Sequence, residues 1–411
     1  DGDWWEGGTA ECARIAGHYK LGKLIDLYDN NHNSLAASTD RTFTEECAKR
    51  FESYGWHTQN DEDGTDLQAI DQALRAARNE TTRPSLVLVH THIGYGSPGK
   101  QDTFEAHGSP LGGEEVKRTK QKLGWPEEPP FFLPHEALTR FRESIGKGEK
   151  AEAEWNRRLS AYAHKFPDLA REFEEVMRGE LPKGWDRAVP DFSADAKGLA
   201  TRAASGKILN AIAPKLPTLI GGSADLNPST FTVLQNLGDF ESSERDFSHS
   251  QGSAGGGYGY GGRNLHFGVR EHGMAASLNG MAAHGGLITF GSTLPMFFGY
   301  IRPAVLLAAL VGLGVIYVFS PHKPGVGGEW AAPPPTRGEV PRFPGAFLGV
   351  GNLWAGEARA PAPAPPRPAC ARSLRGTAAI SSSRRASSSC VLPPCVFSPY
   401  CVFSPYVVSG F

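Results

Sequence analysis

The sequence is poor in cysteine and in net charge. Of its six cysteines, only Cys12 and Cys47 fall within the first 320 residues, and their spacing is not that of metal ligands. The absence of a disulfide framework indicates a reducing compartment. The formal net charge is −2, and no basic stripe runs through the first 320 residues. Neither nucleic acid nor an acidic partner is therefore expected.

Long hydrophobic runs and targeting segments are also missing. The one extended apolar run, residues 303–319, contains two glycines and is short for a bilayer span. It predicts a buried helix followed by a buried strand over 314–319, and no association with a membrane. The chain begins at Asp1, without methionine or a signal-like segment, so we expect an N-terminal truncation that would also have removed any transit peptide.

What is present in the first half is an alternation of amphipathic helices with short apolar strands. This alternation is typical of a parallel α/β sheet covered on both faces. From residue 110 to 186 the periodicity stays helical, charged residues are frequent and no strand signal occurs, which predicts a helical connector. In the first part, helices are predicted over 8–20, 43–54 and 67–77, and strands over 23–28 and 85–90.

The α/β pattern returns near residue 198 and stops near residue 320. A helix to about residue 213 and a strand over 218–221 precede a Ser- and Gly-rich loop, 242–262, which we interpret as a flexible insertion because no helix follows it directly. Residues 321–411 contain no Asp, three Glu and nine Lys plus Arg, among Pro/Ala and Ser/Arg stretches. Such a composition predicts a disordered tail. A partner-binding tail and a gene-model error are the alternatives.

One stretch, residues 264–285, places a carboxylate at the start of a helix among apolar side chains. An apolar strand over 265–269 leads through a charged turn into a helix rich in Ala and Met, and Glu271 lies in the first turn of that helix near Met274 and Leu278. A carboxylate there either caps the helix N-terminus or is held in a dry site where it can keep a proton.

The first residues of the chain supply candidate ligands for a metal and a phosphate. Asp1 and Asn31 are separated by one helix and one strand, so a parallel sheet would return both to the same carboxyl edge. A carboxylate, an amide oxygen and the backbone carbonyl of Asn33 are hard oxygen ligands, which suit Mg²⁺ or Ca²⁺ held together with a diphosphate. Gly2 would let the backbone approach phosphate oxygens closely.

A series of motifs is spread in order over about 320 residues. The motifs occupy residues 1–7, 16–18, 21–25, 28–32, 49–57, 91–98, 107–112, 123–126, 221–226, 268–274 and 314–318. Together they resemble the transketolase family, and most of all the transketolases of plants and other photosynthetic lineages. The resemblance implies an α/β fold of two thiamine-diphosphate-binding-type parallel-sheet domains, both incomplete. It divides the chain into a diphosphate-binding domain over 1–130, a helical connector over 131–195, a pyrimidine-binding domain over 196–320 and the disordered tail over 321–411.

The resemblance implies a role for each candidate ligand of the cofactor. Asp1, Asn31 and the carbonyl of Asn33 would bind Mg²⁺, with Ca²⁺ as a substitute, and Gly2 would lie against the diphosphate. The family usually has Ile at the position of Asn33, so the local packing differs there. Glu271 would bond N1′ of the aminopyrimidine of thiamine diphosphate and promote the imino tautomer that removes the thiazolium C2 proton.

Further positions match the family's pyrimidine pocket and its subunit interface. Phe297 and Tyr300 would pack on the pyrimidine ring, although two aromatics three residues apart on a helix are also typical of a core. Asp225 would belong to the cofactor site, or else it is a turn residue. Glu6 and Glu11 would meet Glu271 of the partner subunit, or else they compensate a helix dipole. The implied assembly is a homodimer whose active sites are shared by two chains.

Three positions match residues that bind substrate in the family. His107 would lie near the thiazolium and the sugar hydroxyls, although a lone loop histidine is usually a surface residue. Arg202 and Ser229 would bind the sugar phosphate. The implied activity is transfer of a two-carbon ketol unit between sugar phosphates, in the pentose phosphate pathway or Calvin cycle, in the chloroplast stroma or the cytoplasm. A dihydroxyacetone synthase and a non-catalytic transketolase-like fragment are the alternatives.

Overall fold

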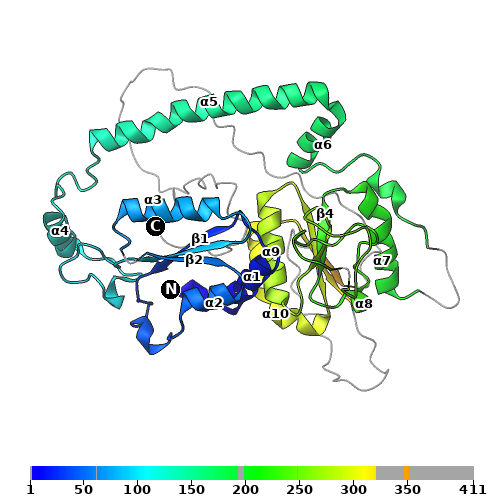
Figure 1. Ribbon diagram of the computed structural model, residues 1–411, viewed down its shortest axis with the longest axis horizontal. Coiled ribbons are helices and arrows are strands. Elements are labelled where there is room, and N and C mark those ends of the chain that lie inside the picture. The colour runs from blue at the N-terminus through cyan, green and yellow to red at the C-terminus, as the bar shows by residue number, and fades with distance from the viewer. Residues whose placement is uncertain (1, 62, 193–198, 248, 321–346, 351–411) are drawn as a thin grey trace, which may run out of the picture.

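The computed structural model describes residues 2–61, 63–192, 199–247, 249–320 and 347–350. These residues form two α/β halves side by side, with a helical connector running along one side of them (Figure 1). Both sheets are parallel throughout, so the predicted fold class is confirmed. Among the described helices, none combines the length and the apolar composition that a bilayer crossing requires.

The first half is built on a three-stranded sheet. Its order is β1 (Ile25–Asn30), β3 (Ser85–His90), β2 (His57–Asp61). The central strand β3 is a run of Val and Leu that is buried along most of its length, as expected of a strand covered on both faces. The covering helices α2 (Cys47–Ser53) and α3 (Leu67–Asn79) lie on opposite faces of this sheet (Figure 1).

The second half is built on a five-stranded sheet. Its order is β5 (Asn264–His266), β4 (Leu219–Ser223), β6 (Ile288–Thr293), β7 (Val315–Phe319), β8 (Phe347–Val350). Strand β8 lies within the stretch expected to be a disordered tail, and the remainder of that stretch is outside the described residues.

Four helices accompany the second sheet: α7 (Thr201–Ile212), α8 (Asn227–Thr230), α9 (Glu271–His284) and α10 (Phe298–Val311). The first nine residues of α9 are almost all buried, and α10 packs directly against α9. The helix expected to be buried within 303–319 is buried on one side only, because Leu310 of α10 is 85% exposed.

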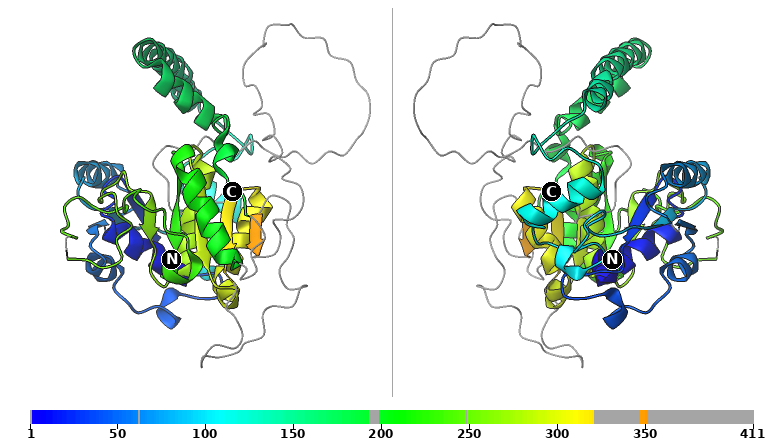
Figure 2. Two further views of the ribbon diagram at one scale, coloured as in Figure 1. Left: turned by 90° about the vertical axis from the view of Figure 1, so that its right-hand side faces the viewer. Right: turned by 90° about the vertical axis from the view of Figure 1, so that its left-hand side faces the viewer.

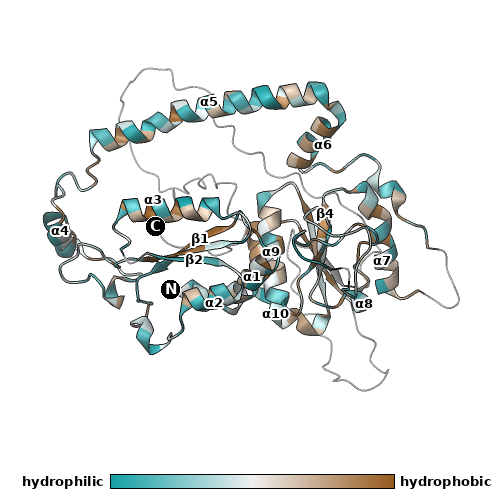
Figure 3. Ribbon diagram, viewed as in Figure 1, coloured by the Kyte–Doolittle hydropathy of each residue, from teal (hydrophilic) through white to brown (hydrophobic). Residues whose placement is uncertain are grey.

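The connector between the halves is helical, as the sequence predicts. It comprises α4 (Gly113–Lys122), α5 (His135–Lys165) and α6 (Pro167–Met177), and no residue of α5 is buried. Two further views show α5 standing apart from the body that contains the sheets (Figure 2). Figure 3 shows that most of its surface is hydrophilic, with hydrophobic residues interspersed. Short 3-10 turns cover Gly2–Trp5, Thr39–Arg41, Phe104–Ala106, Trp185–Ala188, Ala213–Lys215 and Pro295–Phe297.

The two halves are joined through α1 (Gly7–His18), which belongs to the first half but packs on α9 of the second. Ile15 and Tyr19 share a buried cluster with Met274 of α9. The Tyr19 hydroxyl donates to the carbonyl of His266 over 3.0 Å and accepts from its amide over 2.8 Å. A common core and two hydrogen bonds therefore hold the halves together at this contact.

Candidate functional site

The carboxyl edge of the second sheet gathers three predicted site residues. Strand β4 ends two residues before Asp225, and β6 ends four residues before Phe297. Strand β5 ends at His266, and Glu271 follows after a short turn. Because β5, β4 and β6 are parallel neighbours, the three residues follow the same edge, which is where ligands of open α/β sheets bind.

Glu271 is a buried carboxylate with little to satisfy it. The residue is 7% exposed, and Thr293 Oγ1 donates to its Oε1 over a long 3.4 Å. Among the described residues this is the only polar contact of the carboxylate, and no amide of α9 donates a hydrogen bond to it, although it lies in the first turn of the helix. A buried carboxylate with spare acceptor capacity suits a ligand that brings its own N–H donor.

The aromatic residues predicted for the pyrimidine pocket lie at the surface. Phe297 closes a 3-10 turn and Tyr300 lies in α10, with their ring centroids 6.2 Å apart and their planes 37° apart. The Tyr300 side chain is 65% exposed, so the two rings are not a core pair. This partly exposed aromatic pair, which follows strand β6, is available to a ring-shaped ligand or to a second chain.

The residues predicted to bind a sugar phosphate belong to two elements that meet at the Phe231 ring. The Arg202 guanidinium, near the start of α7, lies 5.6 Å from the centre of the Phe231 ring, and Ser229 lies two residues before that ring in α8. Asp225 is exposed in the turn that precedes α8, with a left-handed φ of +63°. A turn role accounts for its conformation, since Asp tolerates this region better than most residues.

The polar residues after β1 lie at the carboxyl edge of the first sheet. The amide of Asn33 donates to Asn31 Oδ1 over 3.0 Å, and Asn33 Nδ2 donates to the Asn31 carbonyl over 2.9 Å. The buried Asn33 side chain therefore hydrogen-bonds the loop in place of the apolar packing that Ile would give. Gly2 is exposed, with nothing within 4 Å of the position of an added Cβ, and Asp1 lies outside the described residues. Within the described ranges, no three His, Cys, Asp or Glu side chains converge to hold a metal ion.

Sequence reasoning missed a row of imidazoles at this same edge. The ring of His90 lies 5.2 Å from that of His32 and 5.3 Å from that of His92. His92 Nδ1 lies 2.9 Å from a carboxylate oxygen of Asp102. Burial acts to raise the pKa of Asp102, but hydrogen bonds from Gln101 and His92 outweigh it and hold that pKa below its usual value. The signal was available, because His90 ends the predicted strand 85–90 and His92 follows two residues later.

His107 lies on the loop that carries His92 and Asp102. It follows the 3-10 turn Phe104–Ala106 and is exposed. The Cα of Gly108, next along the chain, faces Leu35 of the loop that follows β1: a Cβ there would lie 3.4 Å from the Leu35 side chain. The structure thus brings His107 near the loop of Asn31, from a distant part of the sequence.

The two glutamates predicted at the subunit interface differ in their surroundings. Glu6 is exposed at the start of α1, and its side chain caps no amide there. Glu11 Oε2 accepts a 2.7 Å hydrogen bond from the amide of Gly273, in the first turn of α9 of the same chain. Glu11 is therefore already engaged with the helix that carries Glu271 without a second subunit.

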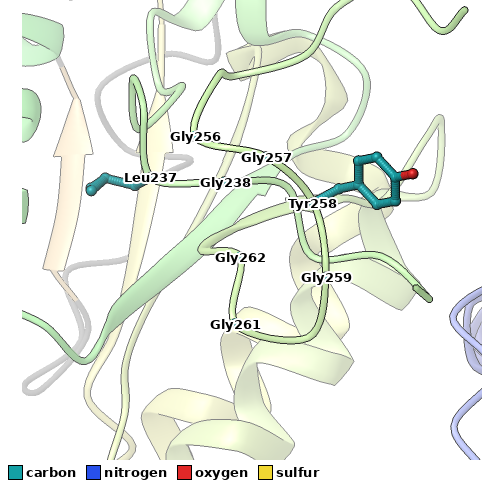
Figure 4. Close-up of a pocket in the computed structure, with 8 residues that line it drawn as sticks. All are labelled: Leu237, Gly238, Gly256, Gly257, Tyr258, Gly259, Gly261 and Gly262. Atoms are coloured by element: carbon teal, nitrogen blue, oxygen red, sulfur yellow. The ribbon is translucent and has the colours of Figure 1, made fainter. Parts of the chain in front are cut away.

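The glycine-rich loop, expected to be a flexible insertion, is fixed by hydrogen bonds. The buried Asp239 carboxylate accepts from Ser253 Oγ over 2.9 Å and lies 2.9 Å from His266 Nε2. Backbone bonds tie the loop to residues 236–241. The loop borders an open hollow of about 240 Å³ that has no charged side chain in its lining. Figure 4 shows the residues that line it. The lining residues are Leu237, Gly238, Gly256, Gly257, Tyr258, Gly259, Gly261 and Gly262.

Two parallel sheets with polar residues at their carboxyl edges define a two-domain α/β protein of the ligand-binding kind. Residues 1–182 match the family model described as the transketolase thiamine diphosphate binding domain. Residues 197–333 match the one described as the transketolase pyrimidine binding domain. The chain therefore belongs to the transketolase family.

Curated and solved relatives agree with this assignment. The chain is 43% identical to a transketolase of Aquifex aeolicus over 86% of its own length and 48% of the relative's. It is 41% identical to a chloroplastic transketolase of Craterostigma plantagineum, over 80% of this chain and 60% of that one. The crystal structure of Pichia stipitis transketolase with sedoheptulose 7-phosphate superposes with a TM-score of 0.72 at 38% identity, covering 78% of this chain and 46% of that one. The chain spans about half the length of the curated relatives it matches.

Proposed function

We propose that this chain carries out, or forms part of, a transketolase reaction, in which a two-carbon ketol unit passes from a ketose phosphate to an aldose phosphate. The observation that carries the proposal is the buried carboxylate of Glu271, with one long hydrogen bond, at the edge of a sheet within a matched pyrimidine binding domain. Relatives that bear the name transketolase, one of them solved with a sugar phosphate, support it.

The match to a thiamine diphosphate binding domain and the oxygen donors after β1 support thiamine diphosphate with Mg²⁺ as the cofactor. Asn31 Oδ1 and the Asn33 carbonyl are hard oxygen donors on one loop, and with Asp1 they would hold the metal, while the open space at Gly2 would admit the diphosphate. When bound, the cofactor supplies the carbanion chemistry. Glu271 would share a proton with ring nitrogen N1′, a role for which its burial and its single long hydrogen bond suit it.

Substrate recognition would use charge and hydrogen bonding from helices α7 and α8 and from the loop that carries His107. Arg202 and Ser229 would bind the phosphate of the sugar through charge-assisted hydrogen bonds, and His107 would contact its hydroxyls. A phosphate-binding pair favours phosphorylated acceptors over formaldehyde, the acceptor of a dihydroxyacetone synthase. The phosphate group also fits a role in the pentose phosphate pathway or Calvin cycle, and the chloroplastic relative is consistent with a chloroplast or cytoplasmic protein.

The proposed assembly is a homodimer in which the first-half edge of one chain faces the second-half edge of another. Its support is the aromatic pair Phe297 and Tyr300 after strand β6, in which Tyr300 is 65% exposed, an apolar surface that a second chain or the cofactor would cover. A non-catalytic transketolase-like protein is the second candidate, favoured by the half-length match to the relatives.

Calorimetric titration with thiamine diphosphate and Mg²⁺ separates these candidates. We expect saturable binding by the chain, at least tenfold weaker binding by Asn31→Ala, and unchanged binding by the matched control Asn79→Ala at the exposed end of α3. A panel of phosphorylated and unphosphorylated acceptors then tests the transferase reaction. Absence of cofactor binding by the unmodified chain would favour the non-catalytic candidate.

A further inference from the structure

Helix α9, which carries Glu271, begins without a capping side chain of its own. The residue before the helix is Arg270, whose guanidinium has only donors and cannot accept a hydrogen bond from a helix amide. Arg270 Nη1 instead donates to the Phe267 carbonyl over 2.8 Å. The first amides of a helix have no partner within the helix, so an acceptor has to come from elsewhere.

That acceptor comes from the other half of the molecule. Glu11 of α1 places Oε2 2.7 Å from the amide of Gly273, the third residue of α9. The amide at this position is one of the two that an N-cap side chain normally satisfies. The negative charge of Glu11 also lies at the positive end of the α9 dipole. Glu11 therefore caps the N-terminus of α9 from the other half of the molecule, because Arg270 cannot cap it.

The contact depends on two helices lying unusually close. A Cβ on Gly273 would lie 2.8 Å from Glu11 Cβ and 3.0 Å from Glu11 Oε2, so any larger residue would displace the cap. On the same face, Cys12 Sγ lies 3.8 Å from the Gly273 carbonyl and 3.9 Å from Ser277 Oγ. Small side chains on both helices therefore allow the Glu11 carboxylate to reach the first turn of α9.

We propose that Glu11 is a positioning residue: by capping the amide of Gly273 it fixes the first turn of α9 and thereby the direction of the Glu271 carboxylate. The functional part of this inference rests on the proposed role of Glu271. Glu271 lies two residues before the capped amide, within the turn whose fraying the cap prevents. The packing of α1 on α9 then also sets the orientation of the Glu271 carboxylate.

Hydrogen exchange of the whole chain without cofactor tests the cap directly. Losing an N-cap acceptor corresponds to about a five-fold increase in exchange. We expect this increase at Gly273 and Met274 in Glu11→Ala. Glu11→Gln should exchange like the unmodified chain, because its amide oxygen still accepts the bond. If Glu11→Ala exchanges no faster, or if Glu11→Gln is as fast as Glu11→Ala, the proposal is wrong.

A matched control removes an equally short bond elsewhere. Glu115 accepts from the Gly99 amide over 2.7 Å, and Glu115→Ala should leave exchange in α9 unchanged. Affinity for thiamine diphosphate with Mg²⁺ gives the functional readout, expected to fall about five-fold in Glu11→Ala and to be rescued in Glu11→Gln. Equal affinity in all three forms would overturn the positioning role. If no form binds the cofactor, the proposed function fails, while the exchange data still decide the cap.

Discussion

Two carboxylates, the half-buried Asp26 and the buried Glu271, have no ion-pair partner among the described residues. Asp26 lies on strand β1, where burial raises its pKa to about 6 although a hydrogen bond from the Leu27 backbone acts in the opposite direction. Glu271 lies at the edge of a sheet, where ligands bind. The burial of the Asp26 carboxylate lowers stability at neutral pH, whereas the burial of the Glu271 carboxylate fits the proton sharing that we propose for it.

Asp26→Asn should stabilise the fold at neutral pH. Because the pKa of Asp26 is raised on folding, the folded chain keeps a proton that the unfolded chain releases between about pH 4 and pH 6. The contribution of this residue to stability therefore falls as pH rises through that interval. Thermal unfolding of Asp26→Asn should show a midpoint a few degrees higher at pH 7 and a flatter profile from pH 4 to 6. The exposed Asp186→Asn is the control, and an unchanged midpoint in Asp26→Asn would contradict the prediction.

Glu271→Gln should abolish transfer while leaving the fold intact. The amide keeps the size and the Thr293 contact but cannot share an acidic proton with a ring nitrogen, so turnover should fall by roughly 10²- to 10⁴-fold. Steady-state rates with a ketose phosphate donor, together with a thermal melt, measure both effects. The exposed Glu152→Gln on α5 serves as control. Near-normal rates in Glu271→Gln would remove the proton-sharing role.

Some site residues could be placed from the sequence because their position follows from local pattern. Glu271 begins helix α9, and Asn31 directly follows strand β1. Both positions could be predicted because a change in the periodicity of apolar residues marks the end of a strand and the start of a helix. The Glu11–Gly273 bond could not be foreseen, because it joins residues 262 positions apart whose meeting depends on how two helices pack.

At the scale of elements, prediction succeeded where strands are apolar and failed where they are not. Strand β3, a run of Val and Leu, occupies the predicted residues 85–90. Strand β2 (His57–Asp61) has the polar sequence of an edge strand, and β6 (Ile288–Thr293) is rich in Thr, Ser and Gly. Both were missed, because their pairing with parallel neighbours, and not their own composition, makes them strands.

Two helical glycines should respond oppositely to alanine. A Cβ at Gly17 of α1 would lie 1.9 Å from the Tyr54 carbonyl, so Gly17→Ala should destabilise by about 1–3 kcal/mol. Gly146 of α5 has nothing within 4 Å of that position, so Gly146→Ala should favour its helix by about 1 kcal/mol. Urea denaturation followed by far-ultraviolet circular dichroism measures both. Equal effects of the same sign would show that helix packing does not distinguish the two sites.

At the scale of the whole molecule, shared sites predict complementation between inactive chains. If each site takes Asn31 from one chain and Glu271 from another, mixed dimers of Asn31→Ala and Glu271→Gln contain one intact site of two. Random mixing should then restore roughly a quarter of the unmodified activity. Refolding the two variants together and assaying transfer provides the measurement. Activity no higher than that of the separate variants would indicate a site built within one chain.

The exposed helix α5 has a mechanical consequence. At about 46 Å for its 31 residues, it is a long tether in which no side chain is buried. The halves are held together instead by the hydrogen bond from Tyr19 to His266 and by the buried cluster that Tyr19 shares with the second half. A single protease nick in α5 would sever the covalent path yet leave two fragments still bound to each other, so the protein could be produced as two separate polypeptides and reconstituted by mixing.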